Sequence, residues 1–143
     1  MIAVDTNILV YAHRQELPKH RAALAALTRL AEGRARWGIP VFCLGEFLRV
    51  ITHPRLFAPP HTTAEATRAV ERLIESPSLE VLNPGGDYLQ LLLNSIRGAQ
   101  VRGNLVFDAQ VVALCREAGV NELLTEDRDF SRFSGLAVRH LEA

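Results

Sequence analysis

The sequence predicts one α/β domain over residues 1–143, built around a parallel sheet. Short β-rich runs alternate with longer segments of helical periodicity along the whole chain, which is the pattern of a parallel α/β sheet. A chain of 143 residues is long enough to bury a real core, and no repeat or linker divides it. Apolar residues make up 48% and charged residues 22% of the sequence, as in ordinary globular proteins.

Five short segments fit strands, because each is an apolar or β-branched run bounded by turn or helix signals. Pro40 lies near the end of the second segment, and residues 83–86 form a Pro- and Gly-rich turn after the third. The expected strands are 2–4, 37–41, 79–82, 122–125 and 137–140.

Helical periodicity fills the segments between these strands. Pro18 can open a helix, where its missing N–H costs nothing, and Thr62 or Thr63 can cap another. Segment 42–52 is apolar on nearly every face, which predicts a central helix. The expected helices cover about 6–12, 18–32, 42–52, 63–76 and 105–118, with one more that Asp87 leads and that ends before Gly103.

The remaining apolar residues suit a core. Cys43 and Cys115 lie in apolar helical patterns with no zinc-like spacing, so we expect buried free thiols. Trp37 and the six Phe are expected to be mostly buried. No run approaches the roughly 20 apolar residues of a membrane span, and residues 1–5 lack the basic region of a signal peptide. A cytoplasmic protein is therefore expected.

The charges leave the partner open. The formal net charge is zero, which argues against a polyanionic partner, yet the basic residues are fifteen Arg and one Lys. Arg binds phosphate in a bidentate fork. A GC-rich genome or a thermophilic source explains the same bias equally well.

Four acids stand where packing explains them poorly. Asp5 ends the first strand and Asp127 follows the fourth, so both can lie at the carboxyl edge where parallel sheets bind ligands. Glu46 and Asp108 share helical faces with apolar residues, where an isolated carboxylate must protonate or find a partner.

Each acid alone also has an ordinary structural explanation. Asp5 can cap the following helix, and Asp108 can favour the dipole of its own helix. The other two have nearby arginines, Arg49 for Glu46 and Arg128 or Arg132 for Asp127. Four independent structural roles explain two acids at the sheet edge and two inward-facing helical acids less well than one shared site does.

Clustered carboxylates repel one another and therefore need cations between them. Hard oxygen ligands select Mg²⁺ or Mn²⁺, and such ions suit phosphodiester hydrolysis, either singly or as a pair about 3.5–4 Å apart. Setting aside four metal-bound acids leaves 12 acidic residues against 16 basic ones, and this excess attracts a polyanion.

Four segments carry a resemblance to a known family. They read AVDTNILVY at 3–11, LGEF at 44–47, FDA at 107–109 and LTEDRDF at 124–130. In order and spacing they resemble the PIN-domain family, and within it the VapC toxins. One such motif would be weak, whereas four in register over almost the whole chain are specific.

The resemblance implies a three-layer α/β/α fold with a parallel sheet of about five strands. It also implies an acidic metal site made by Asp5, Glu46, Asp108 and Asp127. Asp5 and Asp108 are the surest direct ligands. Glu46 and Asp127 can act partly through water, and Glu46 is a candidate to orient the nucleophile.

Further residues follow from the same resemblance. Asn7 and Thr125 match polar positions that hold the carboxylates in place. Asp129 is an additional acid, for which we prefer a cap of the short turn before Phe130. Three arginines flank the acidic motifs and are candidates for RNA phosphate contacts: Arg14, Arg128 and Arg132.

The implied activity is endonucleolytic cleavage of RNA that leaves a 5′-phosphate and a 3′-hydroxyl, with Mg²⁺ as cofactor and Mn²⁺ as a plausible substitute. The family further implies a homodimer and a small VapB-like antitoxin, whose C-terminal segment crosses the active-site groove. Operator binding would come from the antitoxin.

Two other functions remain open from the residues. A haloacid-dehalogenase-like phosphatase would use Asp5 as nucleophile, but it needs a second Asp where this chain has Asn7, and Lys19 is its only candidate lysine. A non-catalytic PIN-like scaffold would bind RNA or protein without cutting. The presence of all four acids argues against such a decayed site.

Overall fold

A computed structural model describes residues 1–142 of the chain. The strands and helices alternate as the sequence predicts, and their bounds differ from the expected ones by about two residues or fewer at most ends. In chain order the elements are β1 Ile2–Val4, α1 Thr6–His13, α2 His20–Glu32, β2 Trp37–Pro40, α3 Val41–Ile51, α4 Thr63–Ile74, β3 Leu79–Leu82, α5 Tyr88–Ala99, α6 Leu105–Glu117, β4 Glu122–Leu124, the 3₁₀ helix η1 Arg128–Arg132, and β5 Ala137–Arg139.

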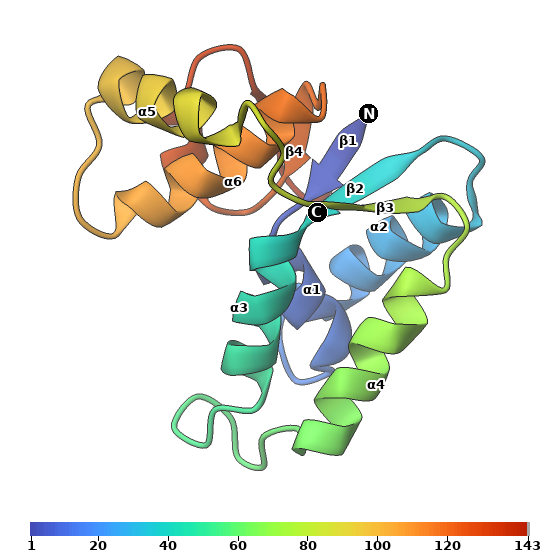
Figure 1. The fold of residues 1–143 in the computed structure, drawn as a ribbon. Helices are drawn as coiled ribbons and strands as arrows, with labels where there is room; N and C mark the ends of the chain where they lie inside the picture. The colour runs from blue at the N-terminus through green and yellow to red at the C-terminus, as the bar shows by residue number, and fades with distance from the viewer. Residues whose placement is uncertain (143) are drawn as a thin grey trace.

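The sheet confirms the predicted fold class. Its five strands are all parallel and run in the order β3-β2-β1-β4-β5. Figure 1 shows α5 and α6 together on one side of the sheet and α1 to α4 on the other, which gives three layers. Among residues 1–142, no helix is long and apolar enough to cross a membrane.

The strand order reverses between β1 and β4, and this reversal positions the candidate site. From β1 the chain builds outward through β2 to β3, and it then returns to add β4 and β5 on the opposite side of β1. Helices leave neighbouring strands in opposite directions at such a point, which opens a crevice beyond the carboxyl ends of the strands. Asp5 and Asp127 follow these two strands.

The core is centred on large side chains from both layers. Trp37, Phe47 and Phe130 are fully buried, and both cysteines are buried free thiols as predicted. Two phenylalanines are exceptions to the expectation that these aromatic residues are mostly buried, because Phe42 and Phe107 are exposed. Each lies in the first turn of its helix, and the buried residues of both helices are at other positions.

Helix α3 is not central, contrary to the prediction. Cys43, Leu44, Phe47 and Ile51 form its buried face. The opposite face is exposed and carries Glu46 among other residues. The apolar side chains on both faces of α3 predicted that the whole helix would be buried. One face is instead exposed and borders a groove beside α6.

Local signals fix some helix ends well and others poorly. Thr62 accepts a hydrogen bond from the Glu65 amide at 3.1 Å, and the Glu65 carboxylate accepts one from the Thr62 amide at 2.9 Å, so Thr62 caps α4 in a capping box. Helix α2 begins at His20 and not at Pro18, because the His20 amide closes a turn onto the Leu17 carbonyl at 3.1 Å.

Candidate metal centre

Asp5 is a buried carboxylate at the end of β1, with 7% of its surface exposed. Its Oδ1 accepts a hydrogen bond from the Thr6 amide at 2.8 Å and so caps α1. Its Oδ2 accepts a short hydrogen bond from the Thr125 hydroxyl at 2.7 Å. Asp5 is therefore both the N-cap of α1 and a residue of the candidate site. Its hydrogen bond with the first helical amide holds the carboxylate at the edge of the sheet.

Thr125 and Asn7 connect the ends of β1 and β4, as expected of supporting residues. The Asn7 amide group donates to the Thr125 hydroxyl at 3.1 Å, and the Asn7 carbonyl oxygen accepts from the Glu126 amide at 3.2 Å. The Thr125 hydroxyl also accepts from the Asp127 amide at 3.0 Å. These contacts fix the loop that carries Asp127 against the strand that carries Asp5.

The structure brings all four predicted acids together. Asp5, Glu46, Asp108 and Asp127 line one pocket of about 280 Å³, although they come from four separate segments of the chain. Tyr11 also lines this pocket, together with the apolar side chains of Val10 and Val50. Separate structural roles for the four acids do not account for this convergence on one pocket.

Asp129 belongs to the same acidic cluster. One carboxylate oxygen each from Asp108, Asp127 and Asp129 lie within 4.8 Å of one another. The preferred interpretation of Asp129 as a helix cap is wrong, because Asp127 caps η1 by accepting the Asp129 amide at 2.9 Å. Asp127 therefore provides the cap with one of its oxygens, and the Asp129 carboxylate lies in the acidic cluster instead of capping the turn.

The electrostatics of the cluster are those of an unneutralised acidic site. The pKa of Asp108 is raised from 3.8 to about 7, mainly by burial and then by the negative charges of the neighbouring acids: Asp127, Asp5, Asp129 and Glu46. Burial also raises the pKa of Asp5, although hydrogen bonds from Thr125 and Thr6 oppose the shift. A cation among these groups would remove the cost of keeping them ionised.

Glu46 lies at the open side of the pocket, with 53% of its side chain exposed. Arg49 approaches its carboxylate at 3.5 Å, as the structural alternative predicted, and the Thr6 hydroxyl donates to it at 3.4 Å. An exposed ion pair one helical turn apart is weak and leaves the carboxylate free to make other contacts. The pair with Arg49 is therefore compatible with a role at the site.

The donor set fits a hard divalent cation. Every charged side chain that lines the pocket is a carboxylate, and oxygen donors favour Mg²⁺ or Mn²⁺ over zinc. Cys43 lies beside Asp5, with Sγ 3.5 Å from Oδ1, but burial raises the pKa of this thiol well above its usual range, so it stays protonated. The contacts of Asp5 with Cys43 and Asn7, at 3.5 and 3.4 Å, are long enough for an ion to replace them.

The three candidate arginines lie in different environments. Arg128 and Arg132 are exposed beside the cluster, and Arg132 approaches Asp129 at 4.0 Å. Arg14 is buried, and its guanidinium contacts Glu16 at 2.8 Å, His61 at 3.1 Å and the Pro59 carbonyl at 3.0 Å. The expected phosphate contact of Arg14 is therefore corrected to a structural role, because these partners occupy its donors.

Lys19 does not serve a phosphatase-like site. Its Nζ pairs with Glu126 Oε2 at 2.7 Å, and it is absent from the residues that line the acidic pocket. Asp5 is also buried and held by hydrogen bonds on both oxygens, which is unfavourable for a nucleophile. Both observations count against the dehalogenase-like alternative.

Comparisons with curated proteins give relatives over nearly the full chain. The chain is 35% identical over 140 residues to the VapC ribonuclease Mb2897 of Mycobacterium bovis, covering 98% of this chain and 95% of that protein. It is 34% identical over 143 residues to ribonuclease VapC31 of Mycobacterium tuberculosis, covering 99% and 97%.

Solved structures share the fold at low sequence identity. The VapBC2 structure from Rickettsia felis, bound to a promoter DNA fragment, matches with a TM-score of 0.72 at 15% identity, covering 99% of this chain and 100% of that one. The structure of VapC20 from Mycobacterium tuberculosis matches with a TM-score of 0.68 at 18% identity, covering 95% and 98%. The model of the PIN domain family matches residues 2–136, so the chain belongs to the PIN domain family.

Proposed function

We propose that this protein is a divalent-metal-dependent endoribonuclease and the toxin of a VapBC-type toxin–antitoxin pair. The observation that carries the proposal is the convergence of Asp5, Glu46, Asp108 and Asp127 on one pocket at the reversal of the strand order. Relatives of about 35% identity are named as VapC ribonucleases, and the chain covers almost their full length.

Mg²⁺ is the proposed cofactor, and Mn²⁺ can substitute for it. When bound, a divalent ion would neutralise the phosphate and lower the pKa of a water molecule. Asp5 and Asp108 would bind it directly, while Asp127 and Asp129 would complete the ligand set directly or through water. Asp129 is included because one of its carboxylate oxygens lies within 4.8 Å of a carboxylate oxygen of Asp108 and of Asp127.

Other residues of this chain would position the carboxylates and the attacking water. Thr125 and Asn7 hold Asp5 and the loop of Asp127 in register. Glu46, exposed at the open side of the pocket, would orient the attacking water and accept its proton. The water would attack phosphorus as the bond to the 3′ oxygen breaks, and the departing oxygen would take a proton from solvent, so that the products carry a 5′-phosphate and a 3′-hydroxyl.

The proposed assembly includes a VapB-like antitoxin and a second copy of the chain. Similar folds occur in VapBC complexes from Rickettsia felis and nontypeable Haemophilus influenzae. The chain exposes large apolar side chains on neighbouring helices, which supports a protein interface: Phe42 on α3, Leu89 and Leu93 on α5, and Phe107 on α6.

The experiment uses protein purified free of antitoxin and a panel of structured RNAs, with cleavage followed by sequencing of the RNA ends. We expect cleavage with Mg²⁺ or Mn²⁺, none with EDTA, and losses of at least 100-fold for Asp5→Asn and Asp108→Asn, because each removes a direct ligand. Asp87→Asn, the same change at the exposed start of α5, is the matched control and should keep full activity.

Two outcomes would contradict the proposal. Cleavage that persists without metal, or in Asp5→Asn, would refute the mechanism. Binding of RNA without cleavage of any RNA in the panel would favour the non-catalytic scaffold.

A further inference from the structure

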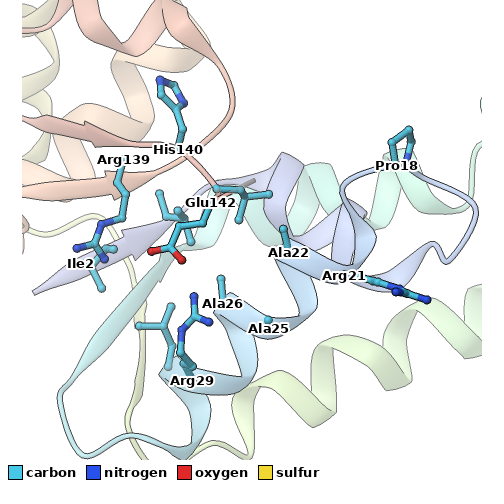
Figure 2. A pocket seen from close by; sticks show the side chains of 13 residues that line it. Ile2, Pro18, Arg21, Ala22, Ala25, Ala26, Arg29, Arg139, His140 and Glu142 are labelled. Carbon is cyan, nitrogen blue, oxygen red and sulfur yellow. The ribbon is translucent and has the colours of Figure 1, made fainter.

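A second pocket lies between α2 and the C-terminal end of the chain, separate from the acidic site (Figure 2). Its volume is about 480 Å³, larger than that of the acidic pocket. Alanines of α2 line one side: Ala22, Ala25 and Ala26. Apolar side chains from β1, α2, β4 and the tail complete the wall: Ile2, Leu30, Leu124 and Leu141. The small side chains of α2 leave space for part of a ligand along the helix.

Arginines surround this apolar wall. Arg21 and Arg29 come from α2, and Arg139 comes from β5. Arg139 pairs with Glu122 at 2.8 Å, whereas Arg21 and Arg29 form no ion pair with any residue of 1–142. Two exposed, unneutralised guanidiniums on one helix make the pocket attractive to an anionic group.

One end of the pocket lies next to the acidic site. Pro18 lines the pocket, and the adjacent Lys19 pairs with Glu126 at 2.7 Å. The other oxygen of Glu126 accepts a hydrogen bond from the Leu141 amide at 2.6 Å, and Leu141 also lines the pocket. Because Glu126 directly precedes Asp127, one set of contacts joins the pocket to the loop of the metal centre.

We propose that this pocket binds two backbone phosphates of the RNA strand outside the cleavage site, one through Arg21 and one through Arg29, which lie about 12 Å apart along α2. The inference rests on the proposed nuclease function and adds a substrate contact distant from the acids. A polyanion held at the acidic pocket would extend past the Glu126 loop toward the two guanidiniums. Their planar donors match phosphate oxygens, and the alanines allow the strand to approach the helix closely.

Glu142 is the residue that opposes this binding. Its side chain lines the same pocket, and Figure 2 shows its carboxylate directed toward the part of α2 that carries Arg29. A negative charge at this position repels a phosphate and attracts the arginine that would bind it. Removal of the charge should therefore strengthen RNA binding, while removal of the arginines should weaken it.

The test measures binding of a labelled single-stranded RNA to the Asp5→Asn protein over a range of salt concentrations. We expect Arg21→Gln with Arg29→Gln to weaken binding about tenfold and to lower the salt dependence by roughly 1.4, because two phosphate contacts are lost. Glu142→Gln should tighten binding several-fold. Arg68→Gln with Arg72→Gln, two exposed arginines of α4, is the matched control and should change affinity little.

Each other outcome overturns the inference in a recognisable way. Equal weakening by the two double variants would indicate a diffuse charge effect, and unchanged affinity in both would remove the pocket from RNA binding. Selective loss of binding to an acidic peptide, with RNA affinity unchanged, would assign the pocket to a protein partner. If the unmodified protein cleaves RNA while the pocket variants bind normally, only this inference fails and the nuclease proposal stands.

Discussion

Asp108→Asn should stabilise the metal-free protein while it abolishes cleavage. Asp108 is half-buried beside other carboxylates, and no group among residues 1–142 donates a hydrogen bond to it. Above neutral pH its negative charge must be kept in an unfavourable environment. Asparagine has nearly the same shape without the charge, so the substitution removes this cost and loses no hydrogen bond.

The magnitude follows from the raised pKa. The shift from 3.8 to about 7 corresponds to roughly 4 kcal/mol at face value. Because Asp108 is only half-buried, solvent screening reduces the expected gain to about 1–2 kcal/mol at pH 8. For a chain of this length, such a gain raises the melting temperature by about 3–6 °C.

The assay is thermal unfolding at pH 8, first in EDTA and then with added Mg²⁺. The variant should melt above the unmodified protein in EDTA, and Mg²⁺ should raise the melting temperature of the unmodified protein but not that of Asp108→Asn, because the variant lacks this ligand. Asp87→Asn serves as the control for a loss of charge outside the site. A variant that melts lower than the unmodified protein in EDTA would refute the claim that clustered charge destabilises the site.

Three further predictions concern the same site. The stability gain of Asp108→Asn should shrink as pH falls from 7 to 4. In this range Asp108 takes up a proton in the folded protein but not in the unfolded protein, because folding raises its pKa, and this removes the unfavourable charge. Urea unfolding at several pH values measures the change. Thr125→Val should cost about 1–3 kcal/mol and weaken Mn²⁺ binding, because it removes the donor to Asp5, and serine at the same position should restore both. Glu126→Gln should lower kcat by weakening the Lys19 and tail contacts, whereas Glu80→Gln, at an exposed ion pair far from the site, should leave kcat unchanged; equal effects would contradict a positioning role.

The strands and the acidic site could be predicted because their signals are local and strong. A buried parallel strand reads as a short apolar run, and the acids Asp5 and Asp127 stand directly beyond two such runs. The reversal of the strand order then brings those ends together. The pattern of residues was therefore sufficient for the five strands and for the four acids of the pocket, whereas the order of the strands comes from the structure.

The errors occurred where contacts between distant segments decide the outcome. Arg14 is next to an acidic motif in sequence, but its partners His61 and Pro59 come from a loop more than 40 residues away. Asp129 has the composition of a cap, yet the preceding acid Asp127 takes the cap position in the 3₁₀ turn. Neither the contacts of Arg14 nor the choice of cap residue can be predicted from the neighbouring residues in the sequence.

The position of β4 beside β1 affects when the protein becomes active during synthesis. Of the two strands that neighbour β1, β4 is made after β2 and β3, so the loop with Asp127 leaves the ribosome after the segments that carry the other three acids of the pocket. A nascent chain can form β1, β2 and β3 without possessing a complete acidic pocket. We therefore expect the nascent chain to leave the RNA of its own ribosome uncut until Asp127 has been made.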